Sequence, residues 1–185
     1  MLWGVITRVI KAMNGKNQGA LDEKDYYQPI MEGLENLFKV SFGDAITELY
    51  LEITANGNFS NRLKSKVPEY RNIIFVFLRR RTSPDVAGFV DFQFGHGDSG
   101  FIVVEFKKEK LELDDVYQAR KYGELFDARY AFLVSLEQIP EELKRLPVAV
   151  PTLFSIAAYK RLTLVTYDGD EFIGWFPENP FGEKR

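Results

Sequence analysis

A glutamate and a lysine separated by one residue stand at the end of an apolar run in the middle of the chain. Residues 101–105, Phe-Ile-Val-Val-Glu, are followed by Phe106 and Lys107. The continuous apolar and β-branched run predicts a strand covered on both faces. Side chains on a strand repeat every two residues, so Glu105 and Lys107 are expected on the same face. A carboxylate beside an ammonium suits a site where a metal ion and a water act on a phosphate.

A second strand is predicted just before the first, at residues 84–94. Residues 95–100, Gly-His-Gly-Asp-Ser-Gly, are dense in turn formers, so the two strands should form a hairpin. A turn centred near residue 97 or 98 brings Asp91 opposite Glu105 to within one position, with Cβ atoms roughly 5 Å apart. Two carboxylates this close repel each other unless a cation lies between them, and Mg²⁺ or Mn²⁺ satisfies that need.

These residues resemble the PD-(D/E)xK superfamily of nucleases, which has the restriction-endonuclease-like fold. Pro84-Asp85 matches the dipeptide that gives the superfamily its name, and Glu105-Phe106-Lys107 matches its acid-x-lysine element. What distinguishes this match from a chance tripeptide is the order: aspartate strand, glycine-rich turn, then an apolar strand that ends in the motif. The resemblance covers about the middle third of the chain.

The RecB-like branch of that superfamily is the most similar. Its G-x-x-D element is matched by Gly88 to Asp91, and its helical Q-x-x-x-Y element by Gln118 to Tyr122. The chain departs from this branch in two respects. It has no upstream histidine, because His96 in the turn is its only one, and it has no cysteines to hold the iron–sulfur cluster of some members.

The resemblance implies divalent-metal-dependent hydrolysis of DNA phosphodiester bonds. It also allows a homodimer, because many nucleases of this fold pair to cut two strands. The implied site consists of Asp91 and Glu105 as ligands of Mg²⁺ or Mn²⁺, the backbone carbonyl of Phe106, Lys107 at the attacking water, and Gln118 and Tyr122 at the border.

Asp85 is the alternative to Asp91 as the metal ligand. It lies six residues further from the turn, roughly 20 Å at ordinary strand rise. Both aspartates can contact the same metal only if a bulge or a longer loop intervenes, and Asp91 is the one that we favour.

Two observations bear on the alternative to a nuclease. Glu142-Leu143-Lys144 repeats the tripeptide pattern in a predicted helix with no aspartate strand before it, so that copy is interpreted as a solvated helix face. A domain of this superfamily can also bind nucleic acid or protein without catalysis, and the net charge of −3 leaves that alternative open.

Basic residues cluster on either side of the predicted site. Arg79-Arg80-Arg81 stands directly before Pro84-Asp85, where it fits phosphate contact and the charged end of a strand equally well. Residues 56–71 are loop-like and fit either a backbone-binding segment or a solvated connector. The candidate nucleic-acid contacts are Arg79, Arg80, Arg81, Lys108, Lys121, Arg62 and Lys64.

Length and composition predict one domain over residues 1–185, with a core of about 22–146. The absence of cysteine favours an intracellular, cytoplasmic protein. Residues 1–13 have helical spacing but are too short and too charged to span a bilayer, so no membrane association is expected.

The remaining elements predict a mixed sheet. Residues 22–40 form a helix, and the resemblance implies that such a helix often lends an additional acid, for which Glu32 and Glu35 are the candidates. Residues 44–54 fit a helix and a strand equally, and residues 73–78 are interpreted as the first core strand. A helix from 114 or 115 to 126, a strand at 130–135, a helix at 140–146 and a hairpin at 161–167 and 171–176 follow. The expected fold is α/β, a mixed sheet flanked by helices with an αβββαβ, restriction-endonuclease-like core and a C-terminal hairpin.

Overall fold

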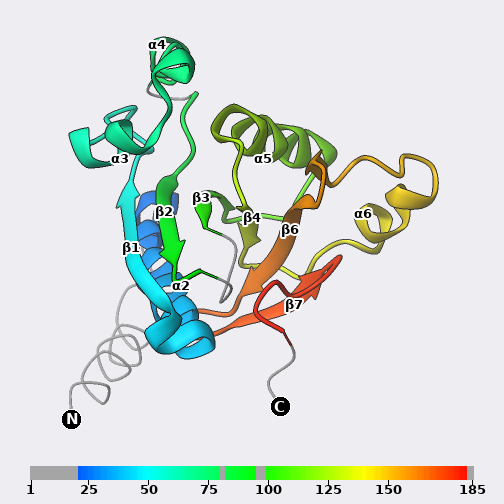
Figure 1. Ribbon diagram of the computed structural model, residues 1–185. Helices are drawn as coiled ribbons and strands as arrows, with labels where there is room; N and C mark the ends of the chain where they lie inside the picture. Colours follow the sequence, from blue (N-terminus) through cyan, green and yellow to red (C-terminus); the bar gives the residue numbers. More distant parts are fainter. Residues whose placement is uncertain (1–20, 80–81, 95–98, 183–185) are drawn as a thin grey trace.

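A mixed sheet of seven strands forms the centre of the molecule (Figure 1). The computed structural model describes residues 21–79, 82–94 and 99–182. The strand order is β1-β2-β3-β4-β6-β5, and β7 pairs with β6. The strands are β1 (Ile46–Ile53), β2 (Val86–Phe92), β3 (Gly100–Lys107), β4 (Tyr130–Ser135), β5 (Ser155–Ala157), β6 (Lys160–Tyr167) and β7 (Phe172–Phe176). The predicted α/β class with a mixed sheet is confirmed.

The sheet is antiparallel on one side and parallel in the middle. β1, β2 and β3 form an antiparallel meander, whereas β3, β4 and β6 run parallel. The parallel pair β3–β4 needs a crossover, which α5 (Leu113–Phe126) supplies. The chain order of α2, β1, β2, β3, α5 and β4 is the predicted αβββαβ order.

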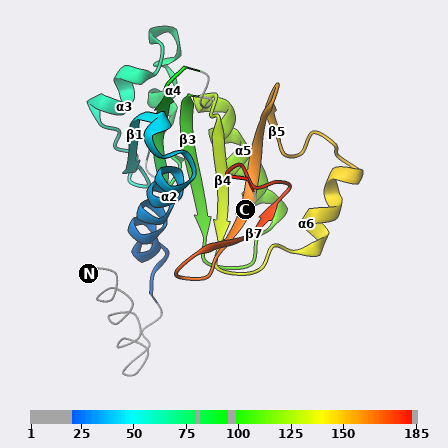
Figure 2. The ribbon, with the colours of Figure 1, turned by 60° about the horizontal axis from the view of Figure 1, so that its bottom comes forward.

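Helices cover the two faces of the sheet with separate apolar layers. On one face, α2 (Tyr27–Phe42) packs Ile30, Leu34 and Phe38 against β2, β3 and β4. On the other face, α5 and three short helices, to which Leu63, Ile74 and Leu143 belong, form the second apolar layer. Figure 2 shows α2 and α5 on opposite sides of the sheet. The remaining helical elements are η1 (Glu23–Tyr26), η2 (Gly43–Ala45), α3 (Asn61–Lys66), η3 (Glu69–Arg71), α4 (Ile74–Phe77), α6 (Glu141–Arg145) and η4 (Leu146–Val148).

The segment between β1 and β2 differs from the prediction. Residues 73–78 are not a core strand, because they contain the short helix α4; Ile74 in this helix and Leu78 at its C-terminal cap are both buried, one turn apart. A six-residue apolar run fits a strand and a helix about equally, so its periodicity did not decide. Residues 56–71, predicted to be loop-like, contain α3 and η3, and the Ser60 hydroxyl caps α3 by accepting the Leu63 N–H at 3.1 Å.

β1 is the first core strand, and its close approach to β2 explains a glycine. Residues 46–53 pair with β2 over their whole length, which resolves the ambiguity between helix and strand. A Cβ atom added to Gly88 would lie 2.0 Å from the Tyr50 carbonyl oxygen and 2.6 Å from the Leu51 side chain. Gly88, which matches the G-x-x-D element, therefore has a structural reason to be glycine.

The predicted C-terminal hairpin is confirmed. β6 and β7 pair antiparallel, and the Asp168 carboxylate accepts the Asp170 and Glu171 N–H groups in the turn. Trp175 on β7 packs against Phe132 of β4, so the hairpin covers the α2 side of the sheet. The helix predicted at residues 1–13 lies outside the described residues. None of the helices in the described part of the chain has the length and apolar character to cross a membrane.

Candidate active site

The register between β2 and β3 brings Asp85 beside Glu105. Val86 pairs with Val104, and the Asp85 N–H donates to the Val104 carbonyl at 3.0 Å. Asp85 and Glu105 are 8% and 3% exposed, respectively. Asp85 and Glu105 are each the next residue beyond the Val86–Val104 pair, so they lie at the same end of the two strands. Two buried carboxylates therefore share one corner of the sheet.

Asp91 lies at the opposite end of β2, so the prediction that it faces Glu105 is wrong. Val90 pairs with Gly100, from which Glu105 is five residues further along β3, roughly 17 Å. This pairing puts the midpoint of the hairpin at position 95, whereas the sequence predicts a turn centred near residue 97 or 98. A shift of one residue in the midpoint changes the pairing partner of each residue by two positions. The Asp91 carboxylate instead lies 2.7 Å from the Lys66 ammonium. Of the two aspartates, it is Asp85, the alternative, that meets Glu105.

Three of the predicted side chains, those of Lys107, Gln118 and Tyr122, gather around Glu105. Its Oε1 accepts hydrogen bonds from Lys107 Nζ at 2.9 Å and from Gln118 Nε2 at 2.6 Å. Gln118 Nε2 also lies 3.4 Å from the Tyr122 hydroxyl, one turn further along α5. Glu105 Oε2 is buried and has no hydrogen-bond partner among the residues that the structure describes. The second oxygen is thus available to a ligand.

Asp85 is held in place by backbone and side-chain donors. Its Oδ2 accepts the Phe106 N–H at 2.8 Å, and the Tyr27 hydroxyl at the start of α2 is also hydrogen-bonded to its carboxylate. The preceding residue, Pro84, accepts the Thr54 hydroxyl through its carbonyl at 2.7 Å. These contacts fix the backbone where β2 begins and aim the carboxylate at Glu105.

Burial makes both carboxylates resist ionisation. The pKa of Glu105 is raised to about 8, chiefly by burial and also by the neighbouring Asp85 charge, while Lys107 opposes the shift. Burial also raises the pKa of Asp85, against the hydrogen bonds from Phe106 and Tyr27 and the charge of Lys107. In the absence of a cation other than Lys107, the pair therefore favours retaining a proton.

Lys107 is held as an ammonium. Burial favours its neutral form, but the charge and hydrogen bond of Glu105 outweigh burial and raise the pKa of Lys107. A second carboxylate, Asp115 of α5, lies 3.9 Å from Nζ. Lys107 is therefore suited to orient a water and to stabilise negative charge on a phosphate, rather than to accept a proton.

Two residues of this site had no place in the sequence prediction. The Glu23 carboxylate of η1 is half-buried; burial raises its pKa, Lys107 opposes this, and Asp85 and Asp115 add to it. Tyr27, four residues later, supplies the hydroxyl on Asp85. The only sequence signal was their position in the first turns of the helix predicted from residue 22.

The acids proposed from the middle of that helix lie elsewhere. Glu32 is exposed and accepts the Gln28 side-chain amide at 2.6 Å, and Glu35 pairs with Lys39 at 3.5 Å. Neither has a contact with the acid pair. Glu23, just before the helix, is instead close enough to Lys107 and Asp85 to interact with their charges.

The acid pair fits a divalent cation that keeps part of its water shell. Within residues 21–79, 82–94 and 99–182, no group of three or more His, Cys, Asp and Glu side chains could enclose a metal ion. Mg²⁺ commonly binds to one or two carboxylates and several waters, so two acids suffice to bind it. The unpartnered Oε2 of Glu105 is the feature that such a cation would satisfy. The Phe106 carbonyl lies between the two motif residues along the chain and remains a predicted ligand.

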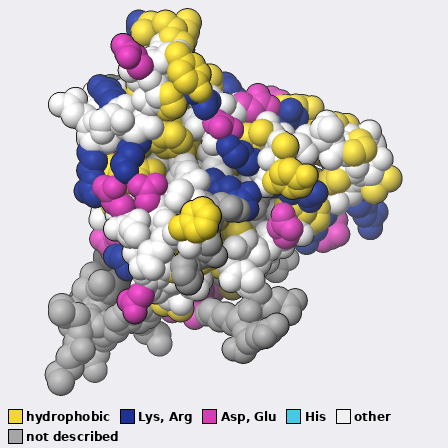
Figure 3. All heavy atoms as spheres, viewed as in Figure 1, with side chains coloured by type: hydrophobic (Ala, Val, Ile, Leu, Met, Phe, Trp, Pro, Cys, Tyr) yellow, Lys and Arg dark blue, Asp and Glu magenta, His cyan; other side chains and the backbone are white. Residues whose placement is uncertain are grey.

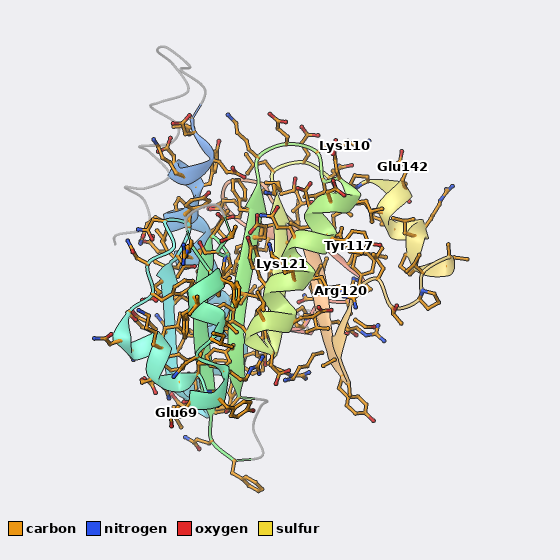
Figure 4. The ribbon with its side chains drawn as sticks, turned by 90° about the horizontal axis from the view of Figure 1, so that it is seen from above. Glu69, Lys110, Tyr117, Arg120, Lys121 and Glu142 are labelled. Atoms are coloured by element: carbon orange, nitrogen blue, oxygen red, sulfur yellow. The ribbon has the colours of Figure 1, made fainter. Side chains whose placement is uncertain are left out.

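The candidate nucleic-acid contacts fall into three groups. Arg62 is neutralised by Glu48 at 2.8 Å, and Lys108 donates to the Leu21 carbonyl at 2.6 Å. Lys121 lies over the Tyr122 ring, with Nζ 4.3 Å from the centroid, on the side of α5 that faces α3 and α4 (Figure 4). Lys64 and Arg79 are exposed, and Arg80 and Arg81 lie outside the described residues.

The second copy of the tripeptide behaves as predicted for a solvated helix face. Glu142 and Lys144 lie on α6, where Glu142 is exposed and Lys144 pairs with Glu141 at 2.7 Å. Figure 4 shows Glu142 on α6, outside the helix α5 that borders the site. Glu142 and Lys144 therefore provide matched control positions for Glu105 and Lys107.

Glu105 should make the cation-free protein less stable as the pH rises. Its folded-state pKa of about 8 exceeds the usual 4.5, so between these values the native state holds a proton that the unfolded chain has lost. Stability should therefore fall from about pH 4.5 to about pH 8, and Glu105→Gln should flatten the fall and raise the melting temperature by several degrees at the upper end. Thermal unfolding in EDTA across this range measures the effect. Curves for wild type and Glu105→Gln that run parallel, as expected for Glu142→Gln, would contradict it.

No protein-family model matches the chain, and neither the curated proteins nor the solved structures contain a significant match. The functional assignment therefore depends on the residues of the site and their geometry.

Proposed function

We propose that this protein is a divalent-metal-dependent nuclease that hydrolyses DNA phosphodiester bonds, as its resemblance to the PD-(D/E)xK superfamily implies. The observation that carries the proposal is the pair of buried carboxylates, Asp85 and Glu105, with Oε2 of Glu105 unpartnered among the described residues. A buried acid pair destabilises the protein unless a cation binds to it, so its presence needs a reason. Cation-assisted chemistry is such a reason.

Each residue has a role in this proposal. Asp85 and Glu105 would hold Mg²⁺ or Mn²⁺, which when bound supplies Lewis-acid stabilisation of a phosphate oxygen and an acidified water. Lys107, whose ammonium lies 2.9 Å from Glu105 Oε1, would orient the attacking water and stabilise charge on the phosphate. Gln118 fixes the rotamer of Glu105 through its 2.6 Å hydrogen bond, and Tyr27 fixes that of Asp85.

A binding module without catalysis is the second candidate. Lys107 already pairs with Glu105, and no three acids, histidines or cysteines among the described residues are grouped so that they could hold a metal ion. The site thus resembles one in which a lysine substitutes for a metal ion. The two functions differ in one respect that is measurable. A nuclease releases shorter products only when a divalent cation is present, whereas a module binds and leaves its ligand intact.

The experiment is incubation of the purified protein with linear duplex, circular, single-stranded and branched DNA and with RNA, in Mg²⁺, Mn²⁺ or EDTA. The proposal expects products in Mg²⁺ or Mn²⁺, none in EDTA, and none from Glu105→Gln, whereas Glu142→Gln should cut like wild type. Cleavage that persists in the Glu105→Gln protein would identify a contaminant or a different site. Products from RNA alone would correct the substrate from DNA to RNA.

A further inference from the structure

An apolar knob projects from the sheet between β1 and β2. We define it as residues 69–79, which comprise η3 and α4. Four of its apolar side chains face solvent: Tyr70 is 83% exposed, Ile73 59%, Val76 50% and Phe77 69%. Figure 3 shows a patch of hydrophobic atoms at the top of the molecule, over α4. Contiguous apolar patches on a protein surface generally mark a binding site.

The knob is rigidly attached to the core. Phe75 packs against Phe59 and Phe126, with ring centroids 5.1 Å and 6.2 Å apart. Arg71 donates to the Leu125 carbonyl at 2.7 Å, at the end of α5. The Thr82 hydroxyl accepts the Arg79 N–H at 3.0 Å and donates to the Phe77 carbonyl at 2.9 Å, which closes the base of the knob. Its exposed side chains are therefore presented on a fixed frame, and binding would cost little ordering entropy.

The charge around the knob is opposite in sign to that of the chain. Residues 61–79 contain five lysines and arginines and a single acid, Glu69, although the whole chain has a net charge of −3. Arg62 and Lys66 are neutralised by β-strand acids, and Arg71 lies 3.6 Å from Asp127. Lys64, over the Phe75 ring, and Arg79, bonded to the Val76 carbonyl, form no ion pair with any residue that the structure describes. The free positive charge thus flanks the apolar patch, which favours a polyanion as the partner.

The knob lies on the same face of the sheet as the acid pair. Ile74 and Leu78 share one apolar layer with Val116, Ala119 and Tyr122 of α5. Gln118 stands eight residues before Phe126 on α5, roughly 12 Å along the helix. Lys121 lies between them, on the side of α5 that faces the knob (Figure 4). A single nucleic-acid strand bound at the knob would therefore run past Lys121 on its way to Glu105.

From these observations we infer that the knob binds the unpaired bases of a single nucleic-acid strand, so that the site acts on single-stranded or branched substrates. The inference rests on the proposed nuclease function for its second half only. Tyr70 and Phe77 provide ring faces for base stacking, Ile73 and Val76 provide the apolar edge of a wedge, and Lys64 and Arg79 contact phosphates. Paired bases inside a duplex offer no ring face to such a knob.

The test measures binding in EDTA, where no metal-dependent cleavage occurs, by fluorescence anisotropy of a labelled strand of about 20 nucleotides. Wild type should bind the single strand more tightly than the duplex of the same sequence. Tyr70→Ala combined with Phe77→Ala should weaken single-strand binding about tenfold or more, because the stacking of bases on the two rings is lost. Tyr117→Ala, on the far side of α5 in Figure 4, should have no effect. The same measurement with a single-stranded RNA of the same sequence shows whether the protein prefers ribose or deoxyribose.

Several results would overturn the inference. One is that wild type binds the duplex and the single strand equally well. Another is that the double variant Tyr70→Ala with Phe77→Ala binds the single strand as tightly as wild type does. If the double variant binds the nucleic-acid strand as wild type does but no longer binds phosphatidylserine vesicles, the knob is a membrane-binding surface. If it binds the strand as wild type does but changes from dimer to monomer in light scattering, the knob is an interface with a second copy of the chain. If the double variant fails to fold, Lys64→Gln with Arg79→Gln tests the same surface by its salt dependence. Strand binding through the knob without cleavage would overturn the nuclease proposal alone, and cleavage independent of the knob would overturn this inference alone.

Discussion

Asp85→Asn is expected to abolish metal-dependent cleavage, whereas Asp91→Asn should leave it nearly unchanged. Asp85 lies beside Glu105 at the strand ends, and Asp91 lies at the other end of β2 in an ion pair with Lys66. Lewis-acid stabilisation is worth several kcal/mol, and each 1.36 kcal/mol is tenfold in rate, so a loss of about a thousandfold or more is expected. Initial rates on a labelled substrate in Mg²⁺ measure it.

The two aspartates control for each other, because both replacements remove one charge from the same strand. Melting temperatures should show that both variants are folded. A larger loss of rate in Asp91→Asn than in Asp85→Asn would mean that the metal site lies at the turn end of the hairpin, as the sequence alone predicts.

Lys107→Ala should lose cleavage while it retains cation binding. Donors aimed at developing charge in an active site are worth about 100- to 1000-fold in rate, and that loss is expected here. Lys107 Nζ occupies Glu105 Oε1 at 2.9 Å, so its removal frees an oxygen and should leave Mn²⁺ affinity equal or higher. Rate assays and Mn²⁺ titrations of Lys107→Ala and the control Lys144→Ala separate the two effects. Loss of Mn²⁺ binding together with cleavage would show that Lys107 organises the site and does not act in it.

The local chemistry of the site was predictable from the sequence, but its long-range pairing was not. Glu105 and Lys107 share a face because a strand has a period of two, which needs no knowledge of the rest of the chain. Gln118 and Tyr122 are one helical turn apart for the same kind of reason. The partner of Glu105 depends on the hairpin midpoint, and a sequence of glycines, Asp98 and Ser99 allows several midpoints.

The fold was predictable to the same extent. The class, the crossover helix α5 and the C-terminal hairpin follow from apolar periods and turn residues. The first strand was assigned to residues 73–78 instead of β1, because β1 shows both periods and the α4 segment is a short apolar run. Glu23 and Tyr27 were missed because only the packed position of the start of α2 brings them to the strand ends.

The central claim is that Asp85 and Glu105 form one cation site, and the most direct test is the thermal shift with Mn²⁺. A cation that binds only the folded state stabilises it by about 2.7 kcal/mol at a hundredfold excess over its dissociation constant, a rise of several degrees. Millimolar Mn²⁺ should raise the melting temperature of wild type, Asp91→Asn and Glu142→Gln alike. The rise should be absent in Asp85→Asn and in Glu105→Gln. An equal rise in all five proteins would mean that the metal binds elsewhere and that the buried acid pair is not a cation site.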